Sequence, residues 1–214
     1  MKAKLKRTAT FLALMGAVST GSAYATEAWY GRVDAGYTVG GELDVDQADD
    51  AFDLEENWMF SGGLGYAFQN GFRLEGEISH RQNDLEENPP TLNEGEAEVM
   101  AGMVNLYYDF NRGARFEPYV GVGVGGAQVD ANAVFNSFND EFDTDDTVVA
   151  YQAMVGVAIG LSENLDLDIG YRYFVAPDLE YDGLQDGQSA SYEADYEHQA
   201  VTLGLRWDFG GAAA

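Results

Sequence analysis

The alternation of apolar and polar side chains with a period of two constrains the fold of this chain more than any other feature. In residues 29–39, Trp29, Val33 and Tyr37 fall on one face of an extended chain, and Arg32 and Asp34 fall on the other. Successive side chains of a β-strand point to opposite sides, so this pattern predicts a strand between two different environments. Seven further stretches repeat it, at residues 58–68, 72–81, 100–110, 119–125, 151–161, 165–173 and 201–209.

The first 25 residues have the features of a secretory signal peptide. A basic start is followed by an apolar run at 11–18 and by Ala23-Tyr24-Ala25, which has the form of a cleavage site. The apolar run is shorter than the roughly 20 residues that a membrane-spanning helix needs, and no other segment is a candidate for such a helix. We therefore expect a signal peptide at 1–25, a barrel at 26–209 and, at 210–214, a short tail or the start of a linker.

The spacing of the eight stretches predicts how they connect. Three short turns, at 69–71, 111–115 and 162–164, alternate with four long connections, at 40–57, 82–98, 129–147 and 175–196. Bacterial outer-membrane barrels have an even number of antiparallel strands, with short turns at one rim and longer loops at the other. The sequence thus predicts an all-β fold, an eight-stranded antiparallel up-and-down transmembrane β-barrel with short periplasmic turns and long acidic extracellular loops.

The charged residues of the strands decide which face of the barrel meets lipid. They share one alternating face, where they are predicted to form an interior ion network of Arg32, Asp34, Arg73, Glu75, Glu77, Asp166, Asp168, Arg172, Arg206 and Asp208. Each arginine exposed at the bilayer midplane would cost about 2–4 kcal/mol, whereas the interior lets opposite charges pair. We expect these side chains to fill the lumen, with leakage of small solutes as the alternative. Arg32 and Arg206 should be neighbours where the barrel closes, with Asp34 and Asp208 as the acids nearest in sequence.

The opposite, apolar face carries aromatic residues near both ends of the strands, as expected at the two lipid–water boundaries. The lower girdle is predicted to contain Trp29, Phe68, Phe72, Phe110, Trp207 and Phe209, and the upper one Tyr37, Trp58, Phe60, Tyr151, Tyr171 and Tyr173. A soluble, lipocalin-like barrel is the alternative fold, but it would need an apolar interior and a mostly polar exterior.

Three segments of the chain resemble the OmpA-like small outer-membrane β-barrel family. They are Trp29-Tyr30-Gly31-Arg32-Val33-Asp34-Ala35-Gly36-Tyr37, the stretch 116–123 and the stretch 167–174. The resemblance implies a bacterial outer-membrane location and an assembly signal in the last strand, which Trp207 and Phe209 match. OmpA-type proteins continue into a peptidoglycan-binding domain, so the chain is expected either to be barrel-only or to begin a linker at Gly210.

Composition excludes several classes of function. The chain has 37 acidic and 11 basic residues, a formal net charge of −26, which excludes nucleic acid as a partner. It contains no cysteine, so neither disulfides nor thiolate metal sites are available. Because 27 of the 37 acids lie in residues 41–57, 82–98, 129–147 and 175–197, we expect diffuse attraction of Ca²⁺ or Mg²⁺ there. Weak candidates for a defined metal site are Asp44, Asp46, Asp143, Asp145 and Asp146, although no segment has EF-hand spacing.

The two histidines do not predict catalysis. Ser79 adjoins His80, but neighbouring residues on a strand point to opposite faces and cannot share a proton. His198 has no serine near it on its own face, so both histidines are interpreted as rim residues and no enzyme is expected.

We predict a structural outer-membrane barrel that contributes to envelope integrity and presents acidic surface loops. The alternatives are a low-conductance passive pore for small solutes and a surface adhesion module. The expected partners are outer-membrane lipid, lipopolysaccharide and the machinery that assembles outer-membrane barrels. We expect a monomer without a cofactor.

Overall fold

The computed structural model describes residues 27–45, 52–53, 57–84, 92–135, 141–185 and 188–209. The predicted signal peptide and residues 210–214 lie outside them. Among these described residues, no helix is long and apolar enough to cross a membrane.

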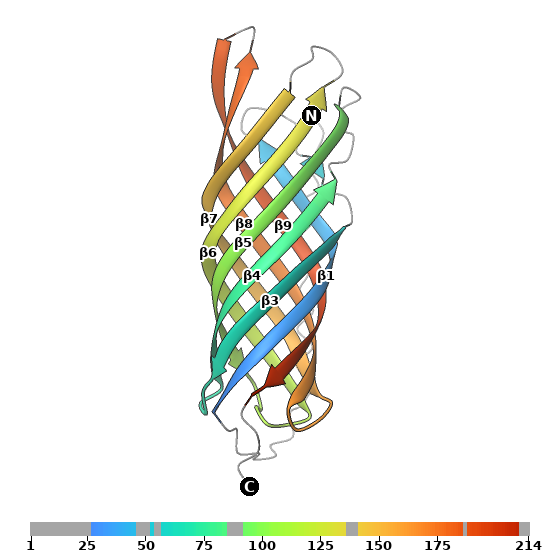
Figure 1. The fold of residues 1–214 in the computed structure, drawn as a ribbon, viewed down its shortest axis with the longest axis vertical. Helices are drawn as coiled ribbons and strands as arrows, with labels where there is room; N and C mark the ends of the chain where they lie inside the picture. Colours follow the sequence, from blue (N-terminus) through green and yellow to red (C-terminus); the bar gives the residue numbers. More distant parts are fainter. Residues whose placement is uncertain are drawn as a thin grey trace, which may run out of the picture.

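Eight long strands form a closed antiparallel barrel, as Figure 1 shows. They are β1 (Ala28–Val45), β3 (Trp58–Ala67), β4 (Phe72–Asp84), β5 (Leu92–Asp109), β6 (Phe116–Phe135), β7 (Glu141–Gly160), β8 (Leu165–Gln185) and β9 (Gln188–Asp208). Each strand pairs with the next along the chain, and β1 pairs with β9 to close the barrel. The short strand β2 (Phe52–Asp53) pairs with β1 at Glu42 and Leu43. The predicted barrel and its eight strands are confirmed.

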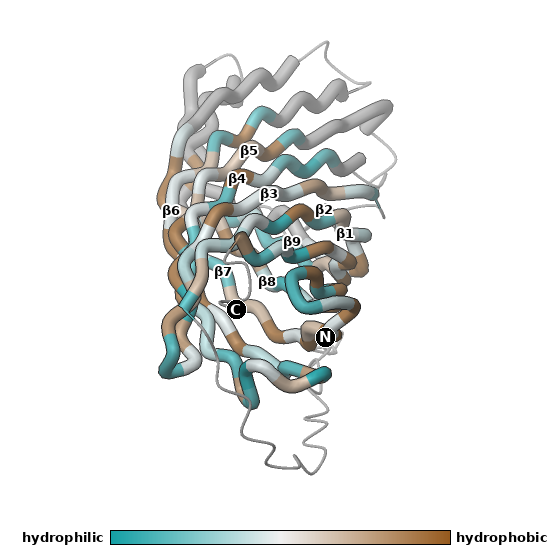
Figure 2. Tube along the Cα trace, turned by 60° about the horizontal axis from the view of Figure 1, so that its bottom comes forward, coloured by the Kyte–Doolittle hydropathy of each residue, from teal (hydrophilic) through white to brown (hydrophobic). Residues whose placement is uncertain are grey.

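Side chains alternate between the lumen and the exterior along the strands. Figure 2 shows the matching alternation of hydrophobic and hydrophilic residues along the backbone trace. Ile78 on β4 is 68% exposed, whereas its neighbour Glu77 is 3% exposed. The exposed set is apolar and the buried set is rich in charge, which is the inverse of a soluble protein. This is the arrangement expected where hydrocarbon, rather than water, surrounds the molecule.

Short turns join the strands at the lower end of the barrel in Figure 1. The turn after β3 contains Gly71, whose φ of 89° lies in the left-handed region that glycine adopts without steric cost. Asn70 accepts a hydrogen bond from the Phe72 amide through its side chain at 3.2 Å. Asn and Gly thus occupy the tight turn that the sequence predicts between these strands.

The strands reach much further from the turns than the alternation pattern predicts. Segments expected to be long loops are in part β-ribbon, because β6 continues to Phe135, β7 begins at Glu141, and only residues 186–187 separate β8 from β9. The predicted loop boundaries were wrong because backbone pairing does not require an apolar face. Residues such as Val134, Phe135 and Phe142 also favour extended backbone among the acids. Figure 1 shows β8 and β9 extending beyond the rest of the barrel.

Candidate functional site

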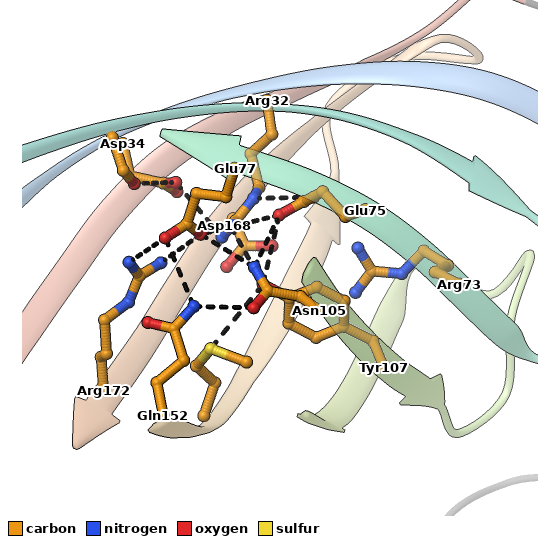
Figure 3. A network of polar contacts seen from close by, with 12 residues as sticks. Arg32, Asp34, Arg73, Glu75, Glu77, Asn105, Tyr107, Gln152, Asp168 and Arg172 are labelled. Carbon is orange, nitrogen blue, oxygen red and sulfur yellow. Dashed lines mark hydrogen bonds and ion pairs between the residues drawn. The ribbon is translucent and has the colours of Figure 1, made fainter. Parts of the chain in front are cut away.

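Charged and polar side chains from several strands form a network across the centre of the lumen (Figure 3). Arg32 on β1 donates through Nη2 to Glu75 Oε1 at 2.7 Å and to Glu77 Oε2 at 2.8 Å, both on β4. Its Nη1 lies 3.2 Å from Asp34 Oδ2. The predicted pairing of Arg32 with Asp34 is therefore present, but the two glutamates of β4 also contribute to it.

Glu77 lies at the centre of this network, between arginines from two strands. Arg172 on β8 donates to its two carboxylate oxygens at 2.5 and 2.8 Å, a bidentate geometry that strengthens the pair. Asn105 on β5 donates to Glu77 Oε2 at 3.1 Å, and Gln152 on β7 donates to Asn105 Oδ1 at 2.7 Å. Because these side chains are buried, they fill the lumen at this level.

A second group of contacts lies nearer the turns. Arg73 donates through Nε to both oxygens of Asp109, at 2.8 and 2.9 Å. Its guanidinium carbon lies 4.5 Å from the centroid of the Tyr107 ring, within the range of a cation–π interaction. Tyr119 donates to Asp168 Oδ1 at 2.5 Å. Arginine in this layer is thus held by both carboxylate and aromatic groups.

Arg206 makes different pairs from those that sequence proximity suggests. It lies opposite Arg32 in the β1–β9 register, as predicted. Its Nη2, however, donates to Glu117 Oε2 at 2.9 Å and to Asp166 Oδ2 at 2.6 Å. Asp208, half-buried, forms none of the ion pairs between described residues. Asp166 is the residue facing Arg206 across β8 and β9, so the register brings it closer than a residue two positions along the same strand.

The structure places most of the predicted network inside the lumen. The buried members are Arg32, Asp34, Arg73, Glu75, Glu77, Asp168, Arg172 and Arg206, and Asp166 and Asp208 are half-buried at the turn end. The inward tyrosines Tyr30 and Tyr107 are not among the predicted network residues. Their positions in the alternation of the strands would have predicted this, because Tyr30 shares a face with Arg32 and Tyr107 shares one with Asn105.

Inward glycines leave the space that these long side chains need. A Cβ atom added at Gly63 would lie 2.8 Å from the carboxyl carbon of Glu75. Added at Gly121, it would overlap the ring of Tyr107. Glycine at these two positions is therefore a packing requirement of the network.

The two histidines lie in different environments, which corrects their shared assignment to the rim. His80 faces outward and its Nδ1 lies 3.5 Å from Glu98 Oε1. His198 is buried in the lumen, where its Nε2 lies 2.9 Å from Thr38 Oγ1 and its ring stacks on Tyr196. The prediction for His198 was wrong because β9 begins at Gln188, so position 198 belongs to the alternating strand. Ser79 is buried while His80 faces outward, so the two do not form a catalytic pair.

Aromatic side chains lie on the exterior of the barrel at the turn end and again part-way along the strands. Those predicted for the girdles lie outside: Trp29, Trp58, Phe60, Phe68, Phe72, Phe110, Tyr37, Tyr151, Trp207 and Phe209 are exposed, and Tyr171 and Tyr173 are partly exposed. Trp29 packs edge-to-face on Tyr66 at the turn end, and Tyr37 packs in the same way on Trp58 further up. Edge-to-face packing is a favourable geometry for aromatic rings.

A cavity of about 380 Å³ opens at the turn end of the barrel. Arg73, Arg206 and Glu117 line its inner wall, and Arg112 and Arg115 line it from the turn between β5 and β6. Partial burial lowers the pKa of Arg112 from its ordinary value. This cavity reaches Arg73. Glu77 and its partners Arg32 and Arg172, here called the Glu77 layer, lie further from the turns.

The part of the chain that the structure describes contains no defined metal site. Among the described residues, no group of three or more histidine, aspartate or glutamate side chains is arranged to hold a metal ion. The side chains of the weak candidates Asp44, Asp46, Asp143, Asp145 and Asp146 lie outside the described residues.

Comparison with known sequences connects this geometry to a family. Residues 10–209 match the family described as outer membrane protein beta-barrel domain. An uncharacterized protein of Brucella abortus (strain 2308) is 28% identical over 191 residues, covering 68% of this chain and 66% of that protein. Outer membrane protein PagN of Salmonella typhimurium is 28% identical over 138 residues, covering 55% of this chain and 58% of that protein. The chain therefore spans less than two thirds of the length of these curated relatives.

Solved structures show the same fold at low sequence identity. OprG from Pseudomonas aeruginosa has a TM-score of 0.59 and 13% identity, with 88% of this chain and 98% of that chain covered. Neisserial surface protein A has a TM-score of 0.54 and 17% identity, with 86% and 99% covered. Both are small outer-membrane barrels, and at this identity the likeness concerns the fold alone.

Proposed function

The chain belongs to the outer membrane protein beta-barrel domain family, and from this premise we propose that it is a structural barrel of the bacterial outer membrane. Its role is to contribute to envelope integrity and to present acidic segments outside the cell. The observation that supports a structural role over transport is the network around Glu77, whose buried side chains cross the lumen from β1, β4, β5, β7 and β8. The interior of an eight-stranded barrel is just wide enough for side chains to fill it.

The absence of a catalytic role is part of the same proposal. Ser79 and His80 lie on opposite faces of β4. His198 contacts the Thr38 hydroxyl through Nε2, but its Nδ1 has no hydrogen-bond partner among the described residues. A catalytic nucleophile needs a base within hydrogen-bond reach, and a third group must in turn orient that base. These contacts support a barrel that is not an enzyme.

Lipid, lipopolysaccharide and the barrel assembly machinery are the partners that we propose. The exposed apolar band and its aromatic girdles support contact with lipid. Trp207 and Phe209, both exposed at the end of β9, support recognition of the last strand during assembly. We propose a monomer with the turns on the periplasmic side.

Single-channel recording in planar lipid bilayers tests the proposal against the pore alternative. The purified barrel should give no steady conductance. A double variant, Glu77→Ala with Arg172→Ala, should conduct because it removes the layer that fills the lumen. Steady conductance by the unmodified barrel, equal to that of the double variant, would favour the pore and overturn a purely structural role.

Envelope integrity is tested in cells that lack the gene. Entry of a bulky apolar dye should rise in these cells and should return to normal when the full barrel is restored. A shortened form without residues 180–193, which belong to the β8–β9 extension, should restore it equally well. Unchanged dye entry, together with loss of surface attachment in cells carrying the shortened form, would favour adhesion.

A further inference from the structure

The lumen changes from charged to apolar beyond the Glu77 layer, toward the end opposite the turns. Ten buried side chains from β5 to β9 form an apolar cluster there: Val99, Ala101, Met103, Ala127, Val129, Ala150, Phe174, Ala176, Leu179 and Tyr196. Four of its members are alanines. This zone of the interior is therefore apolar, with short side chains at these four positions.

Arg81 is a buried cation inside this apolar zone. It is 0% exposed and lies opposite Val99, a member of the cluster, in the β4–β5 register. Its guanidinium carbon lies 3.8 Å from the centroid of the Phe174 ring, another member. Among the described residues, none of its nitrogens Nε, Nη1 and Nη2 has a hydrogen-bond partner.

The other inward arginines all have carboxylate partners. Arg32, Arg73, Arg172 and Arg206 each form ion pairs at 3.2 Å or closer. Glu77, four residues before Arg81 on the same face of β4, is already bound by Arg32 and Arg172. Native proteins rarely bury a charge without a counter-charge, because its lost hydration is then not replaced. The uncompensated Arg81 therefore requires an explanation.

Two neutral polar groups without partners share this part of the lumen. Ser79 Oγ, two residues before Arg81 on the same face, is buried and has no hydrogen-bond partner within the described part of the chain, and the same holds for His198 Nδ1. His198 pairs in register with Phe174, whose ring covers Arg81. Three groups with unused hydrogen-bonding capacity thus lie next to an apolar wall.

We propose that Arg81 binds the anionic head of an amphiphile, a carboxylate carried on an aliphatic body, which enters from the end opposite the turns. The planar guanidinium offers parallel donors to the two carboxylate oxygens. The alanine-rich cluster packs against the aliphatic body, and Phe174 moves off the guanidinium when the head group binds.

Titration with sodium octanoate tests this site directly. The protein, with ¹⁵N-labelled arginine, is placed in phosphatidylcholine nanodiscs, and the Nε–Hε resonance of Arg81 is identified by its loss in Arg81→Gln. Octanoate should shift this resonance saturably. Octan-1-ol, which lacks the charge, should not. Sodium sulfate, which lacks the aliphatic body, should bind more than tenfold more weakly, since each buried methylene strengthens binding about fourfold.

Two variants separate binding from general effects on the barrel. Arg112→Gln, the same substitution in a turn at the other end, should leave the octanoate-dependent shift of Arg81 unchanged. Phe174→Ala should tighten octanoate binding several-fold, because no ring then has to move. Calorimetric titration measures this affinity without an assigned resonance, so the comparison stands even if Arg81→Gln does not fold. Absence of a saturable shift, an equal response to octan-1-ol or sulfate, or an unchanged affinity in Phe174→Ala would overturn the proposal.

Discussion

At the scale of the single residue, Glu77 is the side chain that joins the buried arginines of β1 and β8. It accepts hydrogen bonds from Arg32 and Arg172, which project from β1 and β8, and from Asn105. Arg172 could not remain buried at low cost without it, because a buried charge that loses its partner keeps the full penalty of desolvation. Arg32 retains Glu75 and Asp34, whereas Glu77 is the one described carboxylate that forms an ion pair with Arg172.

The substitution Glu77→Gln should lower the free energy of unfolding by about 3–5 kcal/mol, the usual cost of removing one partner of a buried pair. Urea unfolding in lipid vesicles measures it through the fluorescence of the outward-facing tryptophans. Glu98→Gln is the matched control, because Glu98 is half-exposed and pairs with the outward His80. It should change stability by less than about 1 kcal/mol. Equal effects of the two substitutions would mean that the Glu77 network does not stabilise the barrel.

At the scale of the strand, the two faces impose opposite requirements on the same residue type. Glycine on the inner face of β6 provides space for a facing tyrosine, because a Cβ at Gly121 would overlap the Tyr107 ring and lie 3.0 Å from Met154 Cε. Glycine on the outer face of β4 has no such role, since a Cβ at Gly76 would meet no atom within 4 Å. The direction in which a glycine faces therefore decides its contribution.

Gly121→Ala should destabilise the barrel by about 1–3 kcal/mol, the usual cost of overpacking a filled interior. Gly76→Ala should be neutral or stabilising by up to about 1 kcal/mol, because alanine loses less backbone entropy than glycine on folding. The same vesicle-based unfolding assay compares them. A greater loss of stability in Gly76→Ala than in Gly121→Ala would contradict the close packing assigned to the inner face.

At the scale of the whole molecule, the barrel is closed, charged inside and apolar outside. The pairing of β1 with β9 closes the sheet and extends along β1 from Tyr30 to Val45. A membrane-spanning sheet requires such closure. The exposed leucines Leu203 and Leu161 have the same exposed fraction, 56%. They differ in depth, since Leu203 lies within β9 and Leu161 lies in the turn after β7.

Leu203→Arg should therefore cost about 2–4 kcal/mol in a bilayer, whereas Leu161→Arg should cost no more than about 1 kcal/mol, because the penalty for a charge falls toward the interface. Reversible unfolding in vesicles measures both. In this comparison, identical costs at the two depths would argue against immersion of the β9 surface in hydrocarbon.

The sequence by itself determined the architecture and the sides of the barrel. Alternation assigns each strand residue to one of two faces, and the cost of a charge in hydrocarbon decides which face is inside, so Arg32, Glu77 and Arg172 could be placed without coordinates. The alternation and the cost of a charge in hydrocarbon are both local properties, because they depend only on position along a strand and on side-chain chemistry. The tight turn at Gly71 was predictable for the same reason.

The tertiary structure alone decided which charges meet. Arg206 pairs with Asp166 and Glu117 rather than Asp208, because partners inside a barrel are set by the register between strands and by reach across the lumen. The extension of β9 to Gln188 buries His198, and the same closure leaves Arg81 among apolar side chains without a carboxylate. The alternation with a period of two predicts that a side chain faces inward, but only the closed barrel determines which residues lie opposite it.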